Sequence, residues 1–109
     1  MLDGLWTVEF LGPNNLYGTG VLVIREQRIL GGDAGYYYSG TFEQHNGDFD
    51  GKLTVRRFEP NSISVLGDIE EFSLSFEGKI SESVFSAHAS LDGAPGQTIR
   101  INGTKKEDQ

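Results

Sequence analysis

The chain has 109 residues and no cysteine, and its 9 lysines and arginines stand against 16 aspartates and glutamates, giving a formal net charge of −7. This length suits one domain with one hydrophobic core, and the lack of cysteine excludes disulfides, thiolate metal sites and cysteine nucleophiles. The acid excess argues against direct contacts with nucleic acid or an anionic membrane. A basic protein partner suits this charge better, because opposite fields speed encounter.

Short runs of alternating apolar and polar residues, separated by glycine- and asparagine-bearing turns, predict eight strands. They cover 4–10, 17–26, 28–31, 36–44, 49–58, 71–78, 83–91 and 97–104. Because short turns join most of them, each strand is expected to pair with the next, in an all-β antiparallel meander that closes into a barrel.

One irregular stretch, residues 59–70, interrupts this pattern. Within it, residues 61–67 offer a cap, apolar residues and a terminating glycine, which predicts a short helical turn. We expect residues 1–104 to form the single barrel domain and residues 105–109 to form a frayed tail. No apolar run approaches the ~20 residues that span a bilayer, and the N-terminus lacks a signal-peptide pattern. The expected location is the cytoplasm.

Two strands are apolar on both faces, Val21–Ile24 and Tyr36–Tyr38. A strand of this kind needs a second cover, which is either another subunit or a lid formed by the chain itself. On the first alternative, the candidate residues of a homodimer interface are Val21, Val23 and Tyr37.

Motifs that would indicate catalysis or metal binding fail on inspection. The Gly18–Gly20 segment lies inside a strand pattern with no helix after it, so it is not a phosphate loop. The Asn46–Gly51 segment imitates a calcium loop, but Arg57 stands where the bidentate glutamate is needed. His45 and His88 have no recognisable metal spacing, and no serine lies in a nucleophile-elbow motif. We therefore expect no enzyme activity, no cofactor and no metal.

Five segments share an order and spacing that carry a family resemblance: Gly4–Phe10, Gly18–Ile24, Ile29–Asp33, Tyr38–Gly40 and Leu53–Phe58. Together they resemble the GrlR-type negative regulators of bacterial type III secretion, and the Gly-Gly-Asp that ends the third segment is the most specific element. The resemblance implies a small eight-stranded, lipocalin-like barrel that forms a homodimer. It also implies a negative regulator that binds and blocks a DNA-binding transcriptional activator.

The resemblance points to one hairpin as the partner site. The family's best-known member uses an exposed run of four acids in the hairpin after the Gly-Gly-Asp strand. This chain has Glu43, Asp48 and Asp50 in the matching region, interrupted by Gln44–Gly47. Two interpretations stay open: a basic activator docks on these acids, or they only keep a turn soluble.

A rival function is the carriage of a small apolar ligand, because an eight-stranded barrel is wide enough to hold one small molecule. Several aromatic residues either line such a cavity or fill the core. They are Trp6, Phe10, Phe42, Phe72, Phe76 and Phe85.

Overall fold

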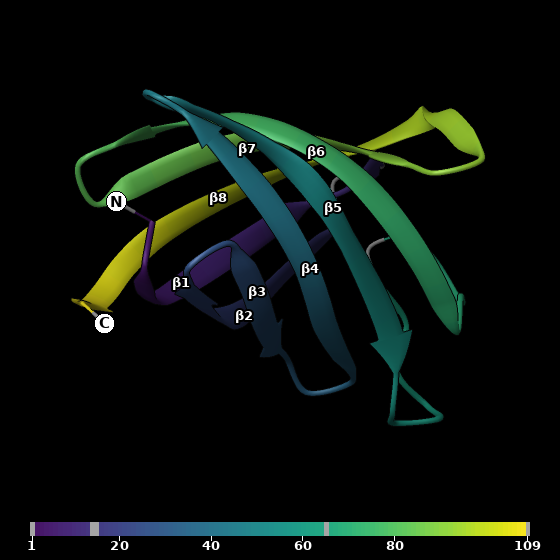
Figure 1. Cartoon of the computed structure of the whole chain (residues 1–109). Helices are drawn as coiled ribbons and strands as arrows, with labels where there is room; N and C mark the ends of the chain where they lie inside the picture. The colour runs from purple at the N-terminus through teal and green to yellow at the C-terminus, as the bar shows by residue number, and fades with distance from the viewer. Residues whose placement is uncertain (1, 14–15, 65, 109) are drawn as a thin grey trace.

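The computed structural model describes residues 2–13, 16–64 and 66–108, and its architecture is a closed barrel (Figure 1). The strands are β1 (Gly4–Leu11), β2 (Tyr17–Arg25), β3 (Arg28–Gly32), β4 (Tyr36–His45), β5 (Asp48–Arg57), β6 (Glu71–Ser81), β7 (Val84–Leu91) and β8 (Ala94–Asp108). Each strand is antiparallel to the next, and β8 pairs with β1 to close the barrel. The all-β, eight-stranded antiparallel meander expected from the sequence is confirmed.

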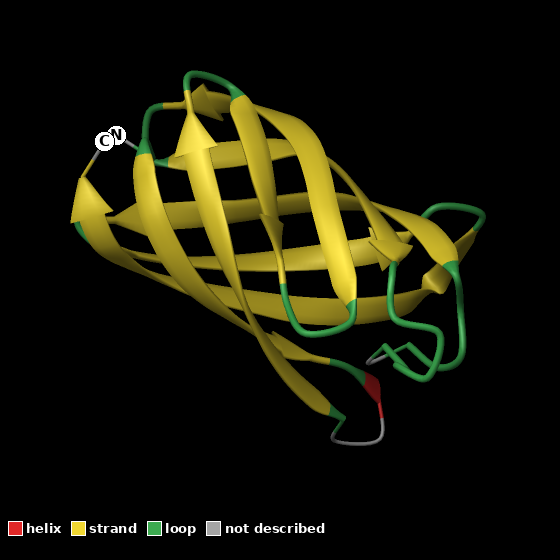
Figure 2. Cartoon of the chain, turned by 90° about the horizontal axis from the view of Figure 1, so that it is seen from below, coloured by secondary structure: helices red, strands yellow, loops and turns green. Residues whose placement is uncertain are grey.

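Three two-residue turns lie at one end of this barrel. Glu26, Asn46 and Glu82, which lie in the two-residue turns of the β2–β3, β4–β5 and β6–β7 hairpins, adopt the left-handed backbone conformation. Such turns match the right-handed twist of their strands, so they fix the hairpin register. The longer connections, including residues 58–70, lie at the other end, which Figure 2 shows together with the tip of the β1–β2 hairpin.

The helical turn expected at residues 61–67 is wrong for the described part of that stretch, and Val65 lies outside the described residues. Ser64 and Gly67 instead form an isolated antiparallel bridge, with both backbone N–H···O distances at 3.0 Å. The Ser64 hydroxyl accepts a hydrogen bond from the Leu66 amide at 2.9 Å, which offers the backbone a local alternative to a helix. Gly67 has a φ of 117°, outside the helical region.

The C-terminal strand is longer than expected, because β8 continues past residue 104 to Asp108. Gly4 pairs with Asp108 across β1 and β8, and the Lys105 amide donates to the Ser83 carbonyl at 2.7 Å. Residues 105–108 therefore belong to the sheet and do not form the expected frayed tail. No helix among the described residues is long and apolar enough to span a membrane.

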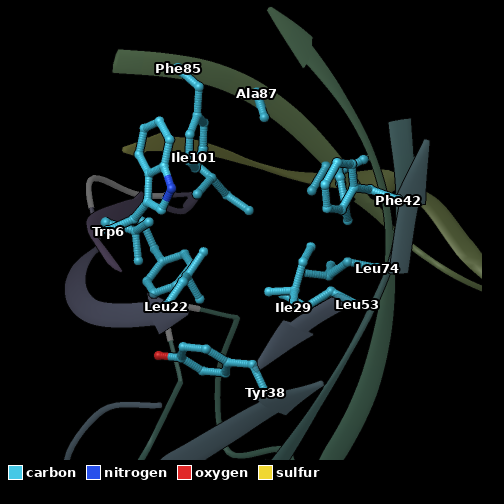
Figure 3. Packing of buried hydrophobic residues seen from close by; sticks show 14 of the residues in the cluster. Trp6, Leu22, Ile29, Tyr38, Phe42, Leu53, Leu74, Phe85, Ala87 and Ile101 are labelled. Carbon is cyan, nitrogen blue, oxygen red and sulfur yellow. The ribbon is translucent and has the colours of Figure 1, made fainter. Parts of the chain in front are cut away.

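Inward-facing residues of all the strands form one core cluster, part of which Figure 3 shows, with Trp6 beside Phe85 and with Phe42 across the barrel from them. Trp6 is fully buried and its ring lies 5.0 Å from the Phe85 ring, while Phe49 contacts both Phe85 and Phe76 at 5.5 and 6.1 Å between centroids. The indole N–H of Trp6 donates to the Leu2 carbonyl at 2.7 Å, so its one polar atom is satisfied. A void of about 40 Å³ with a wholly apolar lining lies inside this cluster.

Candidate functional site

The β4–β5 hairpin carries the acids that the sequence singled out. Glu43 lies directly opposite Asp50 across the two strands, and both side chains face outward into solvent. His45 lies between them, with its Nε2 atom 3.9 Å from Glu43 Oε1 and 3.6 Å from Asp50 Oδ2. The structure therefore brings two of the three predicted partner-binding residues together.

A third carboxylate continues this line on the next strand. Asp50 lies opposite the exposed Glu77 of β6, so Glu43, Asp50 and Glu77 occupy adjacent cross-strand positions on the outer wall. We call these three residues the acidic row. Like charges placed directly opposite each other weaken a sheet. The sequence analysis missed Glu77 because only the β5–β6 register places it there.

Asp48 does not belong to the acidic row. It lies opposite Lys79, and the Lys79 ammonium donates to its carboxylate at 2.8 Å. This hydrogen bond raises the pKa of Lys79. Because its charge is already compensated by Lys79, Asp48 offers less to a basic partner than Glu43, Asp50 or Glu77 does. Among the described residues, no group of three or more histidine or acidic side chains is arranged to hold a metal.

The candidate interface residues Val21, Val23 and Tyr37 all point outward, with 44–46% of their surface exposed. Val23 lies opposite Leu30 of β3, which is 48% exposed, and Gly32 of β3 lies between Val21 and Tyr37. Val21, Val23, Leu30 and Tyr37 thus form one continuous patch over β2, β3 and β4, which we call the outer apolar face. Leu30 is a further member that strand register reveals.

The barrel end away from the β2–β3, β4–β5 and β6–β7 turns has an open rim. The register pairs β2 with β3 only from Val21 to Arg25, so Tyr17–Gly20 pair with β1 alone and leave a gap in the wall. A cavity of about 850 Å³ opens here, bounded by the β1–β2 hairpin, the β3–β4 turn and the 58–70 loop. We call it the mouth hollow. Phe10 and Phe72 line it, whereas Trp6, Phe42, Phe76 and Phe85 do not.

The Gly-Gly-Asp segment builds the rim of the mouth hollow. A Cβ atom on Gly31 would lie 2.2 Å from the Val21 carbonyl oxygen, so only glycine lets β3 approach β2 here. The Asp33 carboxylate accepts hydrogen bonds from the amides of Gly35 and Tyr36, both at 2.9 Å, and from the Tyr38 hydroxyl. The segment therefore leads the chain from β3 into β4, and its Asp33 holds the buried Tyr38 in place.

The 58–70 loop is tied to the same rim. Arg57 Nη1 donates to the Ser62 carbonyl at 3.0 Å and to Asp68 Oδ1 at 2.5 Å. The Tyr36 hydroxyl donates to the Ile69 carbonyl at 2.8 Å. These bonds hold Ser62 and its neighbours at the edge of the mouth hollow.

A protein-family model matches nearly the whole chain. The family model described as GrlR, the negative regulator of type III secretion, matches residues 1–105. No curated protein matches the chain. The match covers β1 to β7 and β8 as far as Lys105, and it includes the Gly-Gly-Asp rim and the hairpin of the acidic row. The chain therefore belongs to the GrlR family of type III secretion negative regulators.

Proposed function

We propose that the protein represses type III secretion genes by binding a basic, DNA-binding transcriptional activator in the bacterial cytoplasm and blocking it. On this proposal it acts by contact, without catalysis and without a cofactor. Membership of the GrlR family supports the regulatory role. The net charge of −7 supports a basic partner, because complementary fields accelerate association.

The acidic row is the main structural evidence for the proposed docking site. Three exposed carboxylates, Glu43, Asp50 and Glu77, lie side by side on β4, β5 and β6, where their mutual repulsion weakens the sheet. A basic partner surface relieves this repulsion when it binds, so the row favours association with lysine- and arginine-rich segments. Arginine side chains suit it best, because a guanidinium binds a carboxylate through two parallel hydrogen bonds.

We further propose that the outer apolar face joins two copies of the chain. Its four residues lie in one patch of the sheet and are each 44–48% exposed, an arrangement that favours a protein contact over solvent. A two-fold axis through the face would place β3 of one copy against β3 of the other, so the same patch serves both subunits. The acidic row lies farther along β4 and on β5 and β6, so dimer formation leaves it free for the activator.

A reporter for type III secretion genes in the source bacterium tests the regulatory proposal. The triple variant Glu43→Gln, Asp50→Asn, Glu77→Gln is expected to lose repression, because it removes the row while keeping side-chain size. The matched control is Glu26→Gln, Glu70→Gln, Glu107→Gln, which removes the same number of exposed acids elsewhere.

The control variant is expected to repress as the unmodified protein does. Equal loss of repression by both variants would show that net charge alone matters and would contradict the row as the docking site. Full repression by the row variant would contradict it as well. Circular dichroism and thermal unfolding of both variants establish that the barrel is intact.

A further inference from the structure

The mouth hollow combines an apolar wall with unbalanced negative charge. Its inner wall includes the rings of Phe10, Tyr36, Tyr38 and Phe72. The Asp33 carboxylate lies at its rim, the Glu9 side chain lies on the outer face of β1 beside it, and no lysine, arginine or histidine lines the hollow among the described residues. Most ligand pockets measure roughly 300–1,000 Å³, and the 850 Å³ of this hollow lies within that range.

The Asp33 carboxylate at the rim of the hollow retains acceptor capacity. A carboxylate offers about four lone-pair sites. Asp33 uses three of them, on the Gly35 and Tyr36 amides and the Tyr38 hydroxyl. Glu9 accepts the Tyr17 hydroxyl at 3.2 Å and the Asn102 side-chain amide at 3.3 Å. The partners of Asp33 are all neutral donors, so its negative charge is left without a counter-charge at the rim of the hollow.

The hollow is pre-formed by close backbone approaches and by the fixed loop. A Cβ atom on Gly20 would lie 2.7 Å from the Tyr38 hydroxyl, so glycine at this position makes room for that group beside the gap in the wall. Arg57 fixes the 58–70 loop on the opposite side through Ser62 and Asp68. A ligand therefore finds an ordered site and loses little affinity to rearrangement of the protein.

We propose that the mouth hollow binds a small amphipathic organic cation, with its apolar body against Phe10, Tyr36 and Phe72 and its protonated amine at Asp33. The aromatic rings suit a cation as well as an apolar body, because their faces attract positive charge. A fatty-acid anion is disfavoured, because its carboxylate would meet Asp33 with no basic lining residue to offset the repulsion. The site extends the regulator with a ligand-binding function that does not depend on the activator.

Three dansyl probes of matched size test this inference on the purified full chain. They are dansylcadaverine, which carries a primary ammonium, N-pentyl dansylamide, which is neutral, and dansyl-6-aminohexanoate, which is an anion. Dansyl emission shifts to the blue in an apolar site, so each titration reports saturable binding. We expect the amine to bind about tenfold or more tightly than the neutral probe, as a hydrogen bond to a charged group requires, and the anion to bind most weakly.

Substitutions locate the site. Asp33→Asn keeps the shape of the side chain and its bonds to backbone amides, and is expected to remove the preference for the amine over the neutral probe. Glu82→Gln is the matched control, because this acid lies in the β6–β7 turn at the opposite end of the barrel, and it is expected to bind all three probes unchanged.

Absence of saturable binding of the amine would overturn the inference. Equal affinities for the three probes on the unmodified protein would overturn it too, and this result does not depend on whether Asp33→Asn folds. Retention of the amine preference by a folded Asp33→Asn would exclude the assigned position of the amine. None of these titrations involves the activator, so their failure leaves the regulatory proposal standing.

Discussion

The Tyr38 hydroxyl donates a hydrogen bond to the Asp33 carboxylate, and this contact joins the Gly-Gly-Asp rim to the buried wall of the barrel. Tyr38 is only 3% exposed, and Figure 3 shows its ring at the edge of the core cluster with the oxygen directed away from Phe42 and Leu74. Burial, followed by the hydrogen bond to Asp33, raises the pKa of Tyr38 well above its usual range. The pair thus couples the Gly-Gly-Asp rim to fold stability.

Alkaline unfolding is expected to report this coupling. The raised pKa means that, above about pH 10, the unfolded chain loses the Tyr38 proton while the folded chain keeps it. The contribution of Tyr38 to stability is therefore complete below pH 10 and declines above it, by about 1.4 kcal/mol per pH unit. Urea unfolding between pH 9 and pH 11 measures the slope. Tyr38→Phe is expected to flatten it, and Tyr37→Phe, at an exposed position, is expected to leave it unchanged.

Removing the carboxylate of Asp33 is expected to destabilise the barrel. Asp33→Ala leaves two amides and the Tyr38 hydroxyl without their acceptor, at a cost of about 1–3 kcal/mol in unfolding free energy. Asp33→Asn retains an acceptor for the backbone amides and is expected to cost less. Urea unfolding at pH 7 compares the two variants. Equal losses would show that the carboxylate charge, and not the turn geometry, carries the stability.

The outer apolar face is expected to control self-association. Val23→Asp places a charge in the centre of the face and is expected to shift the protein from dimer to monomer in sedimentation velocity. Val84→Asp is the matched control, because Val84 is 51% exposed but lies on β7, away from β2–β4. A monomeric unmodified protein, or dissociation of both variants alike, would contradict the proposed interface.

Removing repulsion within the acidic row is expected to raise the stability of the barrel and to weaken binding of the activator. Glu77→Lys replaces a like-charge neighbour of Asp50 with an opposite charge, so we expect a gain of about 0.2–1 kcal/mol in unfolding free energy together with loss of activator binding. Urea unfolding and a pull-down on the same preparation measure both effects. A variant that is stabilised and still binds the activator would show that the row has no part in docking.

The positions of the strands, and the side of the sheet to which each side chain points, could be predicted from the sequence. Both depend on local features, namely the alternation of apolar and polar residues and the turn residues between strands. Register could not be predicted, and it is register that aligns Glu77 with Asp50 and Leu30 with Val23. The prediction of a helical turn at residues 61–67 was wrong, because a cap, apolar residues and a glycine also fit a bridged loop. In that loop the Ser64 hydroxyl forms hydrogen bonds with nearby backbone groups. The end of β8 has no alternation of apolar and polar residues, so the sequence did not predict a strand there. One of its contacts joins Lys105 to the core, because the Lys105 ammonium lies 5.6 Å from the Trp6 ring centroid, and this contact is visible only in three dimensions.

The mouth hollow also lay beyond sequence reasoning. The aromatic residues gave no sign of which would fill the barrel and which would line a cavity. That division follows from where β3 ends, at Gly32, which leaves Tyr17–Gly20 of β2 without a partner on one side. Because β3 is a few residues shorter than β2, the barrel has an open site where a longer β3 would have completed the wall.

The central claim is tested most directly by a low-salt pull-down from the source bacterium, with mass spectrometry of the bound proteins. The unmodified protein, the acidic-row triple variant and its matched control serve as parallel baits. We expect the unmodified protein and the control to recover a basic DNA-binding activator and the row variant to lose it. Recovery of the same activator by all three baits, or of no DNA-binding protein by any of them, would contradict the account.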